Sequence, residues 1–262
     1  PKATFSHLAT MQQFGLSAEL VPLKSIPAVF EEVEKGKALY GVVPVENSTE
    51  GAISRTLDML LSTPLKICGE VMLRVRQNLL RQTGTLDGVR IVYSHAQSLA
   101  QCHSWLNQHL PGAERAAVAS NAEAARLAAG QADAAAIAGE NAAQRYGLEI
   151  VAAEIEDDPS NTTRFLVLGK DESAPSGKDK TSLAVYARNQ PGSLMALIEP
   201  FARLGVGLSK LESRPARSGA WEYVFFIDLE GHYRDATVAE AMKQAADHAL
   251  SLKVLGSYPV AL

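Results

Sequence analysis

The first two thirds of the chain alternate short apolar runs with segments whose apolar residues recur at helical spacing. Four runs have the length and composition of buried strands, at residues 40–45, 89–93, 134–138 and 165–168. Helices are predicted from the Ser25 cap to Gly36, over 52–62, over 97–110, and from the Ser120–Glu123 capping box to Gly130. Strands alternating with helices favour right-handed βαβ units and a mostly parallel sheet.

The pattern changes after a polar segment, residues 171–180, which contains Pro175 and Gly177 and predicts a linker. Strands are then predicted at 182–187, 205–214, 221–229 and 253–259, and helices at 193–204 and 238–250. The order β-α-β-β-α-β is the ferredoxin-like arrangement, with both helices on one face of an antiparallel sheet. Its open edge favours pairing with a second copy.

We therefore expect a domain over residues 1–170, a linker over 171–180 and a second domain over 181–262. The apolar, extended stretch 71–80 is expected to cross between two α/β lobes of the first domain, and the chain returns near 150–160. A ligand cleft between the lobes is the natural consequence, because such sheets bind ligands beyond the carboxyl ends of their strands.

Composition excludes several classes of protein. The net charge is −4 and no basic stripe is present, which argues against a nucleic-acid partner. No apolar run approaches the ~20 residues that span a bilayer, so no membrane partner is predicted. Cys68 and Cys102 are far apart and lack a CxxC pattern, which indicates buried free thiols in a reducing cytoplasm. The six histidines have no metal-ligand spacing, and neither a metal nor a cofactor is predicted.

Three polar clusters adjoin predicted strands of the first domain. Residues 46–51 precede a helix, so helix N–H groups with the Ser48 and Thr49 hydroxyls would hold an anion; alternatively, one hydroxyl only caps the helix. Ser94, His95 and Gln97 follow a strand, where His95 is a candidate for catalysis, although a strand-end histidine is more often structural. No nucleophile elbow is present.

Thr163 and Arg164 precede the strand at 165–168. Arg164 offers a planar fork for a carboxylate, and the Thr163 hydroxyl can donate to a leaving oxygen. The alternative is a hydroxyl that caps a strand end beside a surface ion pair. In the second domain, residues 189–194 form a turn whose amides would cradle a carboxylate, and residues 212–215 close a later strand. The alternative there is two ordinary turns with a solvated ion pair.

Together these segments resemble prephenate dehydratase. The similar segments are Thr4-Phe-Ser-His7, Gly41-Val-Val-Pro-Val-Glu-Asn-Ser48, Tyr93-Ser-His95 and, above all, Asn161-x-Thr-Arg-Phe165. The part after residue 180 resembles the ACT regulatory domain through Asn189-x-Pro-Gly-x-Leu194 and Glu-Ser-Arg-Pro215. The motifs keep the family's order and spacing over nearly the whole chain. Ala3, Ala96 and Ser193 depart from the usual glycine, proline and alanine.

The resemblance implies a carbon–oxygen lyase that removes water and carbon dioxide from prephenate and supplies phenylpyruvate for phenylalanine synthesis. It implies two α/β lobes like a type II periplasmic binding protein, an ACT domain that binds L-phenylalanine, and a cytoplasmic homodimer or dimer of dimers. In many bacteria this unit follows a chorismate mutase domain, and the Met-less start at Pro1 suggests that such a domain, where the native protein has one, has been removed.

The resemblance also assigns residues. Thr163 would be the catalytic hydrogen-bond donor. The expected substrate-binding residues are Thr4, Ser6, Asn47, Ser48, Thr49, Gly51, Ser94, His95, Gln97, Arg164 and Phe165. The expected effector site joins Asn189, Pro191, Gly192, Ser193 and Leu194 of one subunit to Glu212, Ser213, Arg214 and Pro215 of another. Two rival functions remain open: an arogenate dehydratase, and a non-catalytic solute-binding or amino-acid-sensing protein.

Overall fold

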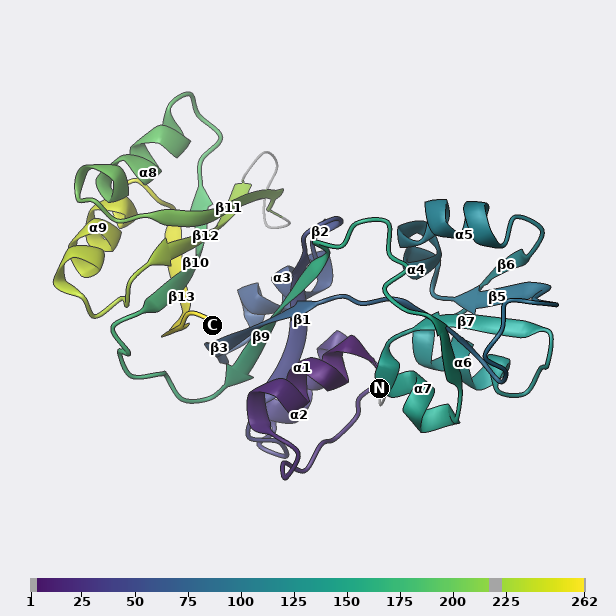
Figure 1. Cartoon of the computed structure of the whole chain (residues 1–262). Helices are drawn as coiled ribbons and strands as arrows, with labels where there is room; N and C mark the ends of the chain where they lie inside the picture. Colours follow the sequence, from purple (N-terminus) through teal and green to yellow (C-terminus); the bar gives the residue numbers. More distant parts are fainter. Residues whose placement is uncertain (1–3, 217–222, 262) are drawn as a thin grey trace. The chain divides into compact units, whose positions relative to one another are not determined.

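A computed structural model describes residues 4–216 and 223–261 (Figure 1). Its helices are α1 Phe5–Phe14, α2 Ile26–Glu34, α3 Ser54–Ser62, α4 Ala96–Gln101, α5 His103–His109, α6 Asn121–Ala128, α7 Glu140–Tyr146, α8 Ser193–Arg203 and α9 Ala236–Ala246. Its strands are β1 Gly41–Asn47, β2 Gly51–Ala52, β3 Lys66–Arg74, β4 Asn78–Arg81, β5 Ile91–Ser94, β6 Glu114–Ala117, β7 Ala134–Ala138, β8 Glu149–Ala152, β9 Thr162–Gly169, β10 Asp179–Ala187, β11 Leu208–Pro215, β12 Tyr223–Glu230 and β13 Ser251–Pro259. Two positions from the sequence analysis lie outside the described residues: Ala3, which departs from the family's usual glycine, and Trp221, where a strand was predicted to start.

The chain forms two compact units. The first comprises residues 1–24, 46–51 and 72–163; the second comprises 25–45, 52–71 and 164–262. The predicted linker 171–180 therefore lies inside the second unit and does not separate the units. The chain leaves the four-stranded sheet after β3 for β4 of a five-stranded sheet, and it returns from β8 to β9.

The five-stranded sheet of the first unit has the order β6-β5-β7-β4-β8. β5 runs parallel to β6 and β7, whereas β4 pairs antiparallel with β7 and β8. Every residue of β7 is buried, and α6 packs on this sheet through Ala124, Ala125 and Ala128. Alanine on both surfaces allows helix and sheet to approach closely at interior packing density.

The helix predicted over 97–110 is two helices, because α4 and α5 are separated at Cys102. The Asp157 carboxylate accepts the backbone N–H groups of Ser104 and Trp105 at 2.9 and 3.2 Å. A side chain distant in sequence thus satisfies the first donors of α5, a capping role that local pattern does not reveal. The apolar face predicted for this segment is still buried.

The four-stranded sheet has the order β2-β1-β9-β3. The predicted cap of α2 is confirmed, since Ser25 Oγ accepts from the Ala28 N–H. The predicted helix start at Ala52 is wrong: α3 begins at Ser54, and Gly51 and Ala52 form β2. Gly51 has a φ of +81°, in the left-handed region that favours glycine.

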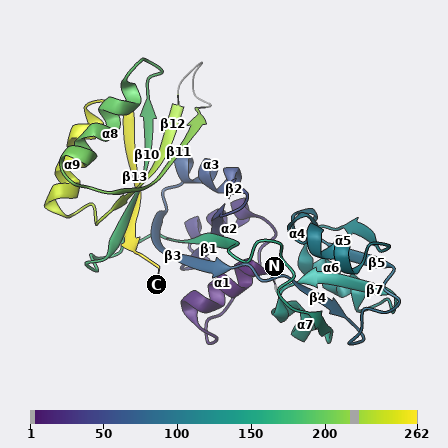
Figure 2. The same ribbon diagram turned by 45° about the horizontal axis from the view of Figure 1, so that its top comes forward.

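Residues after 178 form the predicted β-α-β-β-α-β domain, with the sheet order β11-β12-β10-β13. α8 and α9 pack together on one face of this sheet (Figures 1 and 2), where they bury Leu183, Val185 and Ala187 of β10. The opposite face, through Ala184, Val224, Phe226 and Leu255, joins the core formed by β1, β3, α2 and α3. The ferredoxin-like sheet is therefore buried on both faces within the second unit.

Strand β13 makes a close backbone contact in this shared core. A Cβ placed on Gly256 would lie 2.1 Å from the Ile67 carbonyl oxygen of β3. Nearby, Lys253 Nζ donates to the carbonyls of Leu60, Leu61 and Thr63 at the end of α3. A lysine of the C-terminal domain thus satisfies helix-end carbonyls that have no partner within α3.

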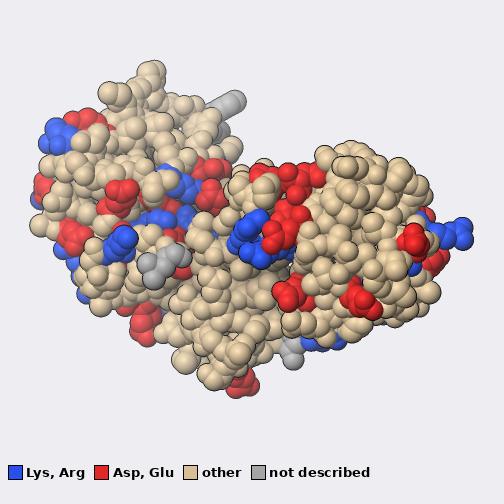
Figure 3. Space-filling view, viewed as in Figure 1, with Lys and Arg blue, Asp and Glu red and all other residues tan. Residues whose placement is uncertain are grey.

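Acidic and basic side chains are interspersed over the face seen in Figure 3, in keeping with the small net charge. None of the helices within residues 4–216 and 223–261 is long and apolar enough to span a bilayer.

Candidate active site

The side chain of Asn47, at the end of β1, organises the turn that follows. Asn47 Oδ1 accepts hydrogen bonds from the backbone N–H groups of Thr49 and Glu50, at 3.1 and 3.2 Å, and from Thr49 Oγ1 at 2.6 Å. Asparagine is favoured in turns for this local bonding to the backbone. Since a backbone N–H can only donate, these bonds fix which end of the Asn47 amide is oxygen.

The nitrogen end of the same amide faces β9. Asn47 Nδ2 donates to Asn161 Oδ1 at 2.8 Å and to Thr163 Oγ1 at 2.9 Å. All three residues are buried, and Thr163 keeps 9% of its surface exposed. We name Asn47, Asn161 and Thr163 the amide–threonine cluster. Thr163 lies within β9, which begins at Thr162, and not before the strand as the sequence predicted.

Ser48 fastens the turn to β9. Its backbone N–H donates to the Thr162 carbonyl at 2.9 Å, and its hydroxyl accepts from the Thr162 N–H at 3.0 Å. Neither Ser48 nor Thr49 caps α3, whose first residue is Ser54. The predicted anion pocket that combined these hydroxyls with the start of that helix is therefore wrong, and so is the alternative of a simple helix cap.

A second polar cluster surrounds Asn121, a residue that sequence reasoning missed. Asn121 Oδ1 accepts from the His95 N–H at 3.1 Å and lies 3.0 Å from Ser94 Oγ. His95 Nδ1 accepts from the Gln97 N–H at 3.3 Å and caps α4. In the sequence, Asn121 directly follows the Ser120 cap and carries no signal beyond membership of the predicted helix. His95 thus makes the structural hydrogen bonds that were the alternative to a catalytic role.

Thr4 and Ser6 lie at the start of α1. Thr4 Oγ1 accepts from the His7 N–H at 3.4 Å and is the N-cap of this helix. The Ser6 carbonyl accepts from Thr10 Oγ1 at 2.7 Å. Both predicted residues thus occupy helix-terminal positions, and the Ser6 side chain is partly exposed.

Arg164 does not have the role predicted for it. Its Nε donates to Glu70 Oε2 at 2.7 Å, Nη1 to Asp228 Oδ2 at 2.6 Å and Nη2 to the Tyr258 hydroxyl at 2.8 Å. Each guanidinium nitrogen already serves a partner within the chain, so no open fork faces a ligand carboxylate. The alternative of a surface ion pair is also wrong, because Arg164, Glu70 and Asp228 are buried.

Further bonds complete this buried charge network. Lys180 Nζ bonds both Glu70 oxygens at 2.9 and 3.0 Å, and Ser182 Oγ lies 2.5 Å from Asp228 Oδ1 and 2.6 Å from the Tyr258 hydroxyl. Burial alone would lower the pKa of Arg164, but Tyr258, Asp228 and Glu70 outweigh it and raise that pKa. Burial, and then Asp228, raise the pKa of Tyr258, so the phenol keeps its proton.

Phe165 is also a core residue, with 1% of its surface exposed. The prediction that it contacts substrate does not agree with this burial. Sequence reasoning missed Asp228 and Tyr258 because each lies in a segment predicted as an ordinary strand, and it missed Glu70 because no element was predicted at that position of β3.

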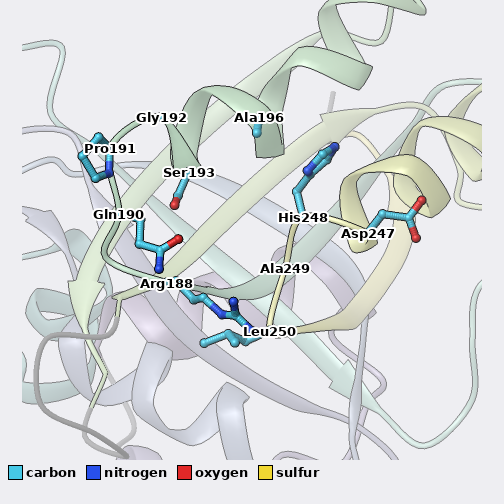
Figure 4. A pocket seen from close by; sticks show the side chains of 10 residues that line it. All are labelled: Arg188, Gln190, Pro191, Gly192, Ser193, Ala196, Asp247, His248, Ala249 and Leu250. Atoms are coloured by element: carbon cyan, nitrogen blue, oxygen red, sulfur yellow. The ribbon is translucent and has the colours of Figure 1, made fainter.

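The second domain contains a cavity of about 390 Å³, a size typical of small-molecule sites. Figure 4 shows Pro191, Gly192 and Ser193 on one side and His248 on the other. These three predicted effector residues line it together with Gln190, which lies within the predicted turn 189–194, and with six residues that were not predicted: Arg188, Ala196, Asp247, His248, Ala249 and Leu250.

The other predicted effector residues do not line this cavity: Asn189 and Leu194 flank the lining residues in sequence, and Glu212 to Pro215 lie on β11. Within the chain, Arg214 Nη1 donates to the Ser54 carbonyl at 3.0 Å and to Asp58 Oδ1 at 3.1 Å. Among the residues described, no group of three or more His, Cys, Asp or Glu is arranged to hold a metal ion.

Comparison with known proteins identifies the family. The sequence profile of prephenate dehydratase matches residues 1–173. The bifunctional chorismate mutase/prephenate dehydratases of Neisseria gonorrhoeae and Stutzerimonas stutzeri are 51% and 50% identical, over all of this chain and 73% and 72% of their own.

Two solved structures are similar over 99% of this chain. The prephenate dehydratase of Arthrobacter aurescens in complex with L-Phe has a TM-score of 0.89 and 33% identity, over 88% of its own chain. GqqA, described as a quorum quenching acylase, has a TM-score of 0.89 and 27% identity, over 96% of its own.

Fold and site thus define a two-lobed, periplasmic-binding-protein-like α/β enzyme with an ACT-like C-terminal part. The chain belongs to the prephenate dehydratase family. Members are hydro-lyases that convert prephenate to phenylpyruvate in phenylalanine biosynthesis, and the predicted enzyme class is confirmed.

Proposed function

We propose that this chain removes water and carbon dioxide from prephenate with Thr163 as the donor to the departing hydroxyl. One observation carries the assignment of Thr163. Its Oγ1 accepts a hydrogen bond from Asn47 Nδ2 at 2.9 Å, so its own proton is directed elsewhere and is available to a ligand oxygen.

The reaction needs such a donor. As the bond to the ring carboxylate breaks, its electron pair enters the ring, the carbon–oxygen bond to the hydroxyl breaks, and the ring becomes aromatic. The departing oxygen takes a proton and leaves as water, and solvent then returns a proton to the enzyme. A threonine hydroxyl is a weak acid, so its contribution comes from placement; positioned acids typically supply ~10²–10⁴-fold.

Binding must favour the transition state over bound prephenate. Holding the departing carboxylate with a full positive charge would oppose its loss, so a pocket of hydroxyls and amides suits it better. With Arg164 and Phe165 set aside, the proposed substrate contacts are Thr4, Ser6, Asn47, Ser48, Thr49, Gly51, Ser94, His95 and Gln97. For Asn47 this contact would be through its backbone, since its side chain is occupied.

The test compares Thr163→Val with Thr163→Ser. Valine keeps the shape but removes the donor, so we expect kcat to fall by ~10²–10⁴-fold while KM changes by a few-fold. Serine keeps a hydroxyl and should retain most of the activity. Formation of phenylpyruvate is followed by its absorbance, with arogenate as a second substrate to separate the two dehydratase activities. A valine variant with near-normal kcat would contradict the assignment.

L-Phenylalanine is proposed as the effector, bound in the cavity beside α8. The Gly192 and Ser193 amides at the N-terminus of this helix suit its carboxylate. Asn189 and Leu194 of the same chain, with residues 212–215 of a second copy, would complete the site. The second copy can approach because β11 is at one end of its sheet and can pair with another chain. The relative from Arthrobacter aurescens binds L-Phe, which supports this choice.

A homodimer, or a dimer of dimers, follows from that arrangement. Ligand bound across two chains favours one arrangement of the pair over another, and this is how it would control the reaction. A cytoplasmic location is part of the proposal, because Cys68 and Cys102 are free thiols.

A further inference from the structure

We propose that Asn47 is a positioning residue that makes Thr163 a hydrogen-bond donor, and that Asn161 anchors it in this role. The inference rests on the proposed role of Thr163. Asn47 was expected to bind substrate, but its side-chain oxygen and nitrogen are both engaged within the chain.

The direction of every hydrogen bond in the cluster follows from two backbone groups. The N–H groups of Thr49 and Glu50 can only donate, so the atom of Asn47 that faces them is Oδ1. The atom facing β9 is then Nδ2, which can only donate. Thr163 Oγ1 must accept from it, and the Thr163 proton cannot point at Asn47.

The same reasoning orients Asn161. Its atom 2.8 Å from Asn47 Nδ2 must be Oδ1, which leaves Asn161 Nδ2 at the other end. That nitrogen is buried, and no described residue accepts a hydrogen bond from it. The orientation of Asn161 is therefore set by its bond to Asn47, and not by a described partner of its own Nδ2.

The bond from Asn47 also strengthens the donor. When the Thr163 proton moves toward a departing oxygen, negative charge grows on Oγ1, and an N–H already aimed at Oγ1 stabilises that charge. Asn47 thereby acts on the reaction without touching the substrate through its side chain.

Asn47→Asp is the decisive variant because it reverses one bond and preserves the others. The new carboxylate still accepts from Thr49 and Glu50, and Asn161 can turn its amide over so that the unmet Nδ2 finds an acceptor. The fold should therefore be retained. The Thr163 hydroxyl, however, now donates to that carboxylate and is lost to the substrate. We expect kcat at saturating prephenate to fall by ~10²-fold or more, with an unchanged or higher Tm.

A double-mutant cycle with Thr163→Val separates the loss of the Thr163 donor from charge repulsion of the substrate. If Asn47 acts through Thr163, adding Asn47→Asp to the valine variant causes no further loss of kcat. Repulsion between the introduced carboxylate and the dianionic substrate would persist in the valine background. Asn107→Asp makes the same change on an exposed residue of the first unit and should leave kcat unaltered.

Each outcome has a defined meaning. A Thr163→Val enzyme with near-normal kcat overturns the proposed function. Two results would overturn only the positioning role, provided that Thr163→Val itself lowers kcat. One is a normal kcat in Asn47→Asp; the other is a loss of kcat from Asn47→Asp that is equally large with and without Thr163→Val. If Asn47→Asp fails to fold, Thr49→Val replaces it, because Thr49 is exposed and supplies one of the bonds that orient Asn47. Its kcat should fall about fivefold, Thr49→Ser should restore it, and the change should have no effect when it is added to Thr163→Val. An unchanged kcat, or an equal loss in the valine background, would refute the inference.

Discussion

Thr163 and Arg164 are neighbours in β9, but their side chains belong to different structures. Thr163 joins the amide–threonine cluster, whereas Arg164 joins a buried network with Glu70, Asp228 and Tyr258. Successive side chains of a strand point to opposite faces, so a motif of adjacent letters need not form one site. Treating Thr163 and Arg164 as one substrate-binding unit was the main error of the sequence prediction.

Arg164→Gln should destabilise the protein strongly. It leaves the Glu70 and Asp228 carboxylates buried without their shared cation, and breaking a buried pair by removing one partner costs about 3–5 kcal/mol. Urea unfolding followed by fluorescence measures the change. The control is Arg203→Gln, which removes the exposed ion pair with Glu199 and should cost under about 1 kcal/mol. Equal effects of the two changes would contradict a structural role for Arg164.

Elements were predicted well where local pattern decides them. The strand 134–138, the Ser25 and Ser120 caps, and the β-α-β-β-α-β order all depend on neighbouring residues and agree with the structure. The break at Cys102 depends on Asp157, about fifty residues away in the chain, and the late start of α3 on the pairing of Gly51 and Ala52. Likewise the sequence predicted Asn47 and Thr163 as site residues, but only the fold reveals which of their atoms form a hydrogen bond.

The contact between β13 and β3 gives the element-level prediction. Gly256→Ala would place a methyl group 2.1 Å from the Ile67 carbonyl, so one strand must move. We expect the free energy of unfolding, measured with urea, to fall by roughly 3 kcal/mol, the upper end of the range for an overpacked core. Gly112→Ala is the matched control, because nothing lies within 4 Å of its added methyl. A Gly256→Ala protein as stable as the control would argue against this contact.

Within the second unit, the two faces of the C-terminal sheet have different neighbours. One face is covered by α8 and α9, beside the cavity proposed to bind the effector, and the other shares a core with β1, β3, α2 and α3. The charge network and the Lys253 bonds to α3 add polar links to the same junction. A change of state in this domain therefore has a packed route toward β9, the strand that bears Thr163.

Ala196→Leu tests the cavity as an effector site. The larger side chain occupies space that L-phenylalanine would need, so we expect its affinity, measured by calorimetry, to fall by at least tenfold while basal kcat is retained. Ala239→Leu makes the same change on an exposed position of α9 and should leave affinity unaltered. An Ala196→Leu enzyme that still responds normally to phenylalanine would exclude this cavity.

The doubly covered sheet also bears on how such enzymes can be recombined. Removing residues 181–262 would strip the apolar lining from α2, α3 and β3, and would take Asp228 and Tyr258 away from the buried Arg164. A chimera that exchanges this regulatory module between relatives must therefore transplant the matching surface with it, as one would for the two halves of an obligate dimer.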